Sequence, residues 1–288
     1  MARTSEHRRV GAPRLGWVLT LLAVLLVSGA GPVSAAAGTQ HGAAAPTWSV
    51  ARNGKVLQVG YGSGVRFPQY AALHLDSGYF RMINSTAAGW GTSVILLPAL
   101  WSKTSCPTDY CQGAPVTASW RKSGATLVLS VRGTIATLQV AVTVTLMPPA
   151  HGVLVARVSV RVTGTVKLDT NRPGEAFKPV MLSSMHDSST VWDARDAFSG
   201  TRVYPFPSSG WIIHPPVTTR DFGLQGGTSR WKANAPTIEV NLNQARPVTG
   251  WLAQMTNPNS DNVGLWCAAS TVLASWSYTV TAETGSQL

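Results

Sequence analysis

Two stretches in the middle of this chain alternate apolar and polar residues almost without a break. In the first stretch the apolar positions are Ala136, Leu138, Val140, Val142, Val144 and Leu146. In the second they are Leu154, Ala156, Val158, Val160 and Val162. Successive side chains of a strand point to opposite faces, so a period of two predicts strands with one buried face and one face in water.

The two alternating stretches continue a pattern that begins upstream. Val116–Lys122 and Ala125–Arg132 flank the turn residues Ser123 and Gly124, which predicts a hairpin. Short turns join all four segments. Because consecutive strands with short connections usually pair with one another, the four predict an antiparallel meander.

The remaining chain favours strands as well. Further strands are expected at Val56–Tyr61, Tyr79–Asn84, Ser93–Leu97, Ile238–Leu242, Val248–Met255 and Ser275–Ala282. Leu265–Trp276 suits a strand or a helix, and no segment of more than a dozen residues has a clear period of 3.6. The 27 glycines and 18 prolines are scattered between the segments, which favours many turns over one linker.

These patterns predict an all-β fold, in which residues 47–288 form a single large antiparallel β-sandwich of the jelly-roll or supersandwich kind. A closed barrel is the alternative. Two sheets with strands this long are similar in outline to the galactose-mutarotase-like sandwiches of sugar epimerases and some polysaccharide lyases. An architecture alone does not transfer function.

The amino terminus resembles an export signal. Four arginines precede an apolar run at Leu15–Val27, and small residues follow at Val33–Ala37. This order predicts a secretory signal peptide over residues 1–35, with a flexible leader over residues 36–46 and a secreted, extracellular protein. The alternative is a membrane anchor, but the run is shorter than the ~20 residues that span a bilayer. The export route, Sec or twin-arginine, is open.

The chain is strongly basic, with a formal net charge of +11. A basic exported protein favours a polysaccharide or another anionic cell-surface polymer as its partner, with simple solubility as the alternative reason for the charge. Nucleic acid is not expected, because Lys and Arg are spread along the strands. We expect no membrane span, since no second hydrophobic run is long enough, and a monomer.

The three cysteines have separate expected roles. Cys106 and Cys111 bracket a short turn-forming loop, which predicts a disulfide in an exported chain, with a zinc pair as the rival. Cys267 lies in an apolar run and is predicted to be a buried free thiol.

A polar cluster near residue 190 is the candidate catalytic site. His186, Asp187, Asp193, Arg195 and Asp196 fall within eleven positions of a chain that has 12 acidic residues in all. If residues 181–190 form a strand, neighbouring His and Asp side chains point to opposite faces, so His186 and Asp187 do not form a catalytic pair.

Three kinds of chemistry fit the cluster. In β-elimination from a uronic-acid polymer, His186 is the base, Arg195 or Arg202 neutralises the substrate carboxylate, and Tyr204 passes a proton. In glycoside hydrolysis, two of the carboxylates act as a pair. No cofactor is expected, although Asp193 and Asp196 could share a structural calcium with backbone carbonyls. An ion-pair knot with a purely structural role is the alternative to all three.

Tryptophans supply a second signal, since the chain has 11. Trp90 and Trp211 lie in expected loops and Trp192 and Trp231 lie near charges, so these four, together with Arg202, are candidate substrate-binding residues. Three others fall in strand patterns and are expected in the core: Trp120, Trp251 and Trp276.

Two hypotheses follow. The first is a secreted carbohydrate-active protein, a polysaccharide lyase or glycoside hydrolase. The second is a non-catalytic carbohydrate-binding or cell-surface interaction module. Whether the protein is an enzyme is open, because the common hydrolase, zincin and nucleotide-binding motifs are absent.

Overall fold

The computed structural model describes most of the chain after residue 44. The described residues are 45–63, 69–82, 92–108, 110–151, 153–166, 176–185, 194–199, 202–226, 237–243, 248–257, 260–268 and 275–283. They all belong to one compact unit, Ala43–Leu288. The expected signal peptide lies outside the described residues. No helix in the described part of the chain is long and apolar enough to cross a membrane.

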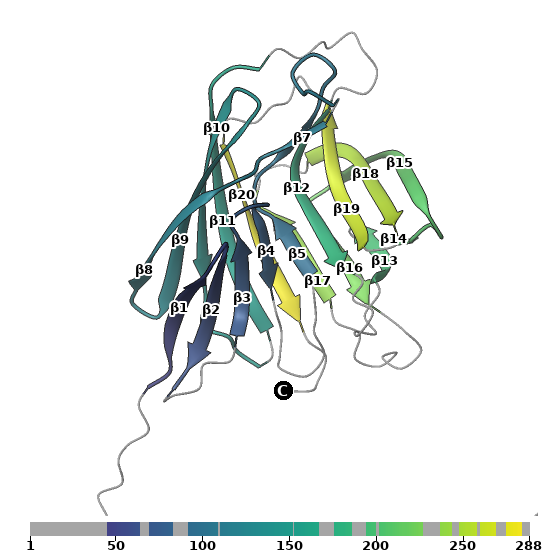
Figure 1. The fold of residues 1–288 in the computed structure, drawn as a ribbon. Helices are drawn as coiled ribbons and strands as arrows, with labels where there is room; N and C mark the ends of the chain where they lie inside the picture. Colours follow the sequence, from purple (N-terminus) through teal and green to yellow (C-terminus); the bar gives the residue numbers. More distant parts are fainter. Residues whose placement is uncertain are drawn as a thin grey trace, which may run out of the picture. The chain divides into compact units, whose positions relative to one another are not determined.

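The described strands form two antiparallel sheets (Figure 1). The first, called sheet A, has the order β1 (Thr47–Asn53), β2 (Val56–Gly62), β3 (Gln69–His74), β4 (Tyr79–Met82), β5 (Thr92–Ile95), β12 (Ala176–Met185), β19 (Ser260–Ala268), β18 (Val248–Asn257), β15 (Gly210–Thr219). Two short strands, β6 (Ala99–Trp101) and β7 (Tyr110–Gln112), extend it beside β12.

Sheet B has the order β14 (Arg202–Pro205), β13 (Ala194–Ser199), β16 (Asp221–Gly226), β17 (Thr237–Leu242), β20 (Ser275–Glu283), β11 (Val153–Thr163), β10 (Leu138–Leu146), β9 (Thr126–Ile135), β8 (Thr117–Ser123). Neither sheet closes on itself within the described residues. The predicted all-β class with two broad antiparallel sheets is confirmed.

The predicted meander is also confirmed, and its apolar face is buried. β8, β9, β10 and β11 pair in order, and Val142 lies opposite Val160 while Thr143 lies opposite Ser159. Val142 and Val160 are buried, whereas Thr143 and Ser159 are exposed. The alternation in the sequence therefore sets which face of sheet B points inward.

A single hydrophobic core joins the two sheets. It contains Leu57, Phe80 and Phe177 of sheet A together with Val142 and Tyr278 of sheet B, all of them buried. Because the inner faces of both sheets contribute to one core, the arrangement is that of a sandwich.

One segment looks irregular in the sequence but contains strands. Residues 172–232 are rich in proline, aromatic residues and charge and show little alternation, yet β12 to β16 lie within them. Three of these strands contain register shifts, between Phe177 and Val180, Ala194 and Asp196, and Ile213 and Pro216. A bulge places an extra residue in the strand and breaks the period of two, which is why the pattern hid these strands.

Two tryptophans also differ from their predictions. Trp120 and Trp251 were expected in the core, but their side chains are 44% and 36% exposed. Both belong to strands: Trp251 points to the outer face of sheet A, opposite Trp266, whereas Trp120 lies opposite the core residue Leu129 on the edge strand β8 of sheet B. Trp276 is buried, as predicted. In the ambiguous stretch Leu265–Trp276, the described residues belong to strands β19 and β20.

Candidate functional site

Four aromatic side chains gather around one lysine on the outer face of sheet A. The ring of Trp266 lies 5.3 Å from that of Trp101 and 5.8 Å from that of Trp211, centroid to centroid. Trp101 also contacts Trp211 at 6.4 Å and Tyr110 at 6.2 Å, both edge-on. We call these four rings and Lys178 the aromatic site.

Strand alternation and one bulge place the lysine in this cluster. On β12, Phe177 and Val180 both belong to the core, and the register shift between them leaves Lys178 on the outer face. On β19, Leu265 points into the core and Trp266 points outward. Gly264 leaves room for the lysine stem, since a Cβ there would lie 3.1 Å from the Cδ of Lys178.

Lys178 is a buried cation that is surrounded by rings. Its side chain is 4% exposed. Its Nζ lies 4.4 Å from the ring centroid of Trp266, 5.4 Å from that of Tyr110 and 5.7 Å from that of Trp211. The negative faces of aromatic rings attract a cation, and this attraction grows when water is excluded.

The lysine has no carboxylate partner among the described side chains. Its one hydrogen bond there is donated to the Sδ of Met181, at 3.3 Å. Burial lowers the pKa of Lys178 to about 7, because desolvation disfavours the charged form and no anion offsets it. The ammonium is therefore poised to lose its proton near neutrality.

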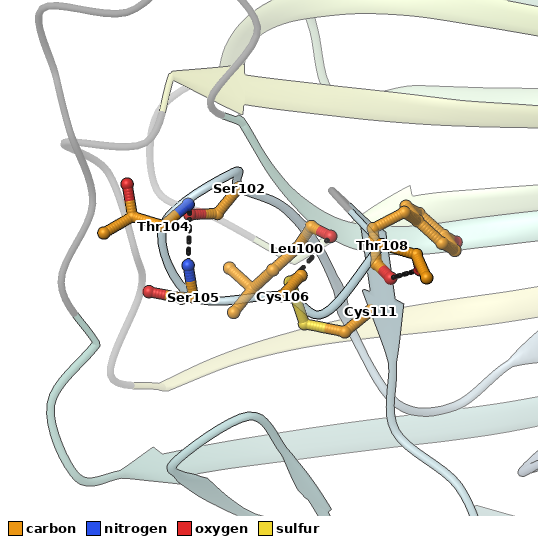
Figure 2. The surroundings of a disulfide bond; sticks show 8 residues. Leu100, Ser102, Thr104, Ser105, Cys106, Thr108 and Cys111 are labelled. Carbon is orange, nitrogen blue, oxygen red and sulfur yellow. Dashed lines mark hydrogen bonds between the residues drawn. A yellow bond between two sulfur atoms is a disulfide. The ribbon is translucent and has the colours of Figure 1, made fainter.

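The predicted disulfide lies in the β6–β7 hairpin, which carries two of the rings. Cys106 and Cys111 are bonded, and Cys111 lies beside Leu100 (Figure 2). In the β6–β7 ladder, the next pair after Leu100 and Cys111 is Trp101 and Tyr110. The loop is held further by Ser102, whose hydroxyl accepts hydrogen bonds from the backbone N–H groups of the residues at 104 and 105.

Cys267 is free and buried, as predicted. Burial raises the pKa of its thiol to about 11. It is therefore a packing residue at neutral pH.

The aromatic site is open to solvent at Trp211, and a second exposed tryptophan, Trp251, adjoins it. Trp211 is 48% exposed, and Trp251, which lies opposite Trp266 in the β18–β19 ladder, is 36% exposed. Trp211 was expected in a loop but lies in strand β15. The candidate substrate-binding residue is thus exposed, and its position is fixed by a ladder of backbone hydrogen bonds to β18.

A second group lies where the last strands of the two sheets approach each other. Arg202 and Tyr204 of β14 line a cavity of about 420 Å³ with Ser199 and the end of β15. The ring of Tyr204 packs against that of His214 at a centroid distance of 4.4 Å.

The ring of His214 is held by hydrogen bonding. It bonds to the side-chain oxygen of Gln254, whose amide donates to the backbone oxygen of Tyr204 at 2.9 Å. The hydroxyl of Tyr204 is buried without a hydrogen-bond partner among the described atoms. Two predicted site residues, Arg202 and Tyr204, therefore belong to this second group.

The structure does not describe the side chains of the remaining predicted site residues. His186, Asp187, Asp193, Trp90, Trp192 and Trp231 lie outside the described residues. Arg195 and Asp196 lie in β13, where the backbone alone is described. No group of three or more potential metal ligands occurs among the described residues, and the suggested calcium pair includes Asp193, which is not one of them.

Five residues of these groups were not predicted from the sequence: Lys178, Trp101, Tyr110, Trp266 and His214. A signal for Lys178 was present, because it is the one charged residue in the run from Ala176 to Leu182. A charge within an apolar strand is costly and therefore marks a special environment. The rings around it come from distant parts of the chain, so spacing in the sequence could not identify them.

Comparison with known proteins gives no relative. The chain matches no known protein family, and no curated protein shows significant sequence similarity to it.

Proposed function

We propose that this is an exported carbohydrate-binding protein that holds the sugar residues of a polysaccharide on the aromatic site. The observation that carries the proposal is the pair of half-exposed indoles, Trp211 and Trp251, on neighbouring strands around Trp266. Indole faces stack on the C–H faces of sugar rings, and large exposed aromatic groups on a rigid surface are typical of ligand sites.

The rigidity of the site supports this role. Trp211 and Trp266 belong to strands that are held in β-ladders. The disulfide holds together β6 and β7, which carry Trp101 and Tyr110. A preformed platform loses little conformational entropy when a flexible polymer binds to it.

Three further features support an extracellular setting and an anionic polymer. The amino terminus resembles a secretory signal, a disulfide is typical of proteins from oxidising compartments, and the chain is strongly basic. A basic surface attracts acidic polymers over distances of about 10 Å or less at physiological salt.

The test is a matched pair of tryptophan variants. Trp211→Ala removes an exposed ring of the aromatic site, whereas Trp120→Ala removes a ring of similar exposure from β8 of sheet B. A panel of polysaccharides is screened by affinity electrophoresis. We expect Trp211→Ala to weaken binding about tenfold or more, as interface tryptophans commonly do, and Trp120→Ala to leave it unchanged. Equal effects of the two variants would contradict the proposal.

Degradation of the polymer is the second candidate, favoured by the placement of Arg202, Tyr204 and His214. β-Elimination needs a group that neutralises the carboxylate, a base and a proton donor. Arg202 and Tyr204 line one cavity, and the ring of His214 packs against Tyr204, so the three side chains supply such groups close together. Incubation with acidic polysaccharides would produce the absorbance of unsaturated uronic acid, and Tyr204→Phe would abolish it. New reducing ends without that absorbance would instead favour glycoside hydrolysis.

A further inference from the structure

We propose that the aromatic site selects acidic sugars, and that the Lys178 ammonium pairs with the carboxylate of a bound uronic-acid residue. This inference rests on the proposed function and specifies its ligand class. The site would take a polyuronate in preference to a neutral polysaccharide of the same length.

Lys178 has no counter-ion among the described side chains. Lys178 is 4% exposed, and no described carboxylate contacts it; Met181 and the three nearby rings are its neighbours. A buried charge is costly unless it is paired. The rings stabilise the ammonium in part, but none of the described side chains provides an anion, which a ligand carboxylate can supply.

Lys178 lies next to Trp211, the exposed ring on which a sugar is proposed to stack. Its Nζ lies 5.7 Å from the ring centroid of Trp211, which is 48% exposed, while Trp266 on the other side is 8% exposed. Trp211 is thus the solvent-facing part of the cage. A sugar stacked on that indole would present its carboxylate at the ring edge, beside the cage that holds Nζ.

The buried position of Lys178 favours acidic sugars over neutral ones. A neutral sugar gains the stacking contacts alone, whereas a uronate gains an ion pair in a site from which water is excluded. Such a pair is stronger than one at an exposed lysine, because the effective dielectric constant is lower. A buried lysine under an aromatic platform therefore discriminates between acidic and neutral sugars.

Binding should then be linked to the proton on Lys178. Burial lowers its pKa to about 7, so the free site is largely protonated below neutrality and largely neutral above it. Of the described groups packed around it from β6, β7, β15 and β19, Tyr110 is the one that titrates, and burial raises its pKa to about 12. The uronate itself stays ionised, so affinity for it should fall as the pH rises through 7.

The experiment compares two oligosaccharides of the same length, oligogalacturonate and a neutral galacto-oligosaccharide. Binding to the full exported chain is measured by tryptophan fluorescence at about pH 6 and about pH 8, at constant ionic strength. We expect oligogalacturonate to bind about tenfold more tightly at the lower pH, since the protonated fraction of Lys178 falls about tenfold over this range. Binding of the neutral oligomer should not change.

Two lysine variants separate this site from general electrostatic attraction. Lys178→Met keeps the length and the packing of the side chain but removes the amine. Lys122→Met removes one positive charge from an exposed position on β8. We expect Lys178→Met to lose both the preference for the acidic oligomer and its pH dependence, and Lys122→Met to keep both. Circular dichroism checks that each variant is folded.

Each other outcome overturns a defined part of the argument. Equal binding of both oligomers by the natural protein would refute the selection of acidic sugars and leave the carbohydrate-binding proposal standing. Binding of neither would refute both. Retention of the acidic preference by folded Lys178→Met, or its equal loss in Lys122→Met, would refute the role of Lys178.

Discussion

The meander of β8 to β11 and the group of β12, β15, β18 and β19 use the same antiparallel ladder in different ways. The pairing of β10 with both neighbours runs without a register shift, and its outer face carries small polar residues such as Thr143 and Ser159. In the second group, β12 and β15 contain shifts, and the outer face carries tryptophans and a buried lysine.

The difference shows how a sheet obtains a site. A regular ladder sends each residue to the face that its number in the strand dictates, so one side becomes core and the other becomes solvated surface. A bulge removes that constraint locally. The bulge on β12 lets the chain keep Phe177 and Val180 in the core and still turn Lys178 outward beneath the rings.

The largest effect is expected in the meander. Val142→Asp or Val158→Asp would place an unpaired charge in the core, at side chains that are 1% and 2% exposed. The cost of such a charge, about 3 to 5 kcal/mol, approaches the whole stability of a typical domain. We expect neither variant to accumulate in folded form, as measured by circular dichroism and chemical denaturation.

The matched controls are one residue away. Thr143→Asp and Ser159→Asp face water on the same strands and should change the free energy of unfolding by less than about 1 kcal/mol. A similar loss of stability in both pairs of variants would show that the assignment of the buried and exposed faces of the meander is wrong.

The regular half is also the part that the sequence predicts well. The alternation from Ala136 to Val162 suffices to assign the strands, their pairing and their buried face, because each residue there follows one local rule. In β12 and β15 that rule is interrupted by a bulge beside Pro179 or Pro215, so a segment made largely of strands looks irregular.

The aromatic site was predicted less completely than the fold. Trp211 could be proposed as a ligand-binding residue because of its type and its polar, Gly-containing surroundings. Lys178 could have been noticed as the one charge in an apolar run, but not its burial under rings, since these come from β7, β15 and β19, which lie far apart in the sequence. The disulfide was predictable, because its two cysteines are close in the chain.

A pair of glycines tests how closely packed each half is. A Cβ at Gly250 on β18 would lie 2.5 Å from the backbone oxygen of Trp266, which cannot move without disturbing the ladder. A Cβ at Gly133 on β9 would lie 2.9 Å from a methyl group of Leu97, which can shift. We expect Gly250→Ala to cost about 3 kcal/mol and Gly133→Ala about 1 kcal/mol in chemical denaturation. A larger loss of stability in Gly133→Ala than in Gly250→Ala would show that the meander tolerates an added methyl group less well than the second group of strands.

Lys178, on β12 of the second group of strands, should also make the stability of the protein depend on pH. Burial lowers its folded-state pKa to about 7, so above pH 7 the unfolded chain holds a proton that the folded chain has lost. Stability should therefore rise with pH from about 7 to about 8.5, with a slope of up to about 1.4 kcal/mol per pH unit.

The sign is specific to a lysine whose pKa is lowered. Cys267 and Tyr278, whose pKa values burial raises, would lower the stability instead, and only at higher pH. Chemical denaturation of the natural protein and of Lys178→Met across this window measures the effect. A slope that persists in Lys178→Met would assign it to another group.

The effect of the disulfide should be small for a cross-link and local to the second group of strands. Replacing both cysteines with serine opens a loop between residues only 5 apart in sequence, so the entropy gained by the unfolded chain is worth about 2 kcal/mol. The consequence should appear instead in the aromatic site, because the loop joins β6 and β7, which carry Trp101 and Tyr110. We expect the double variant to keep the stability of the meander, measured by hydrogen exchange at β10, while exchange at β7 accelerates and sugar binding weakens. Equal acceleration in both places would mean that the disulfide stabilises the whole sandwich and that the two halves do not differ in this respect.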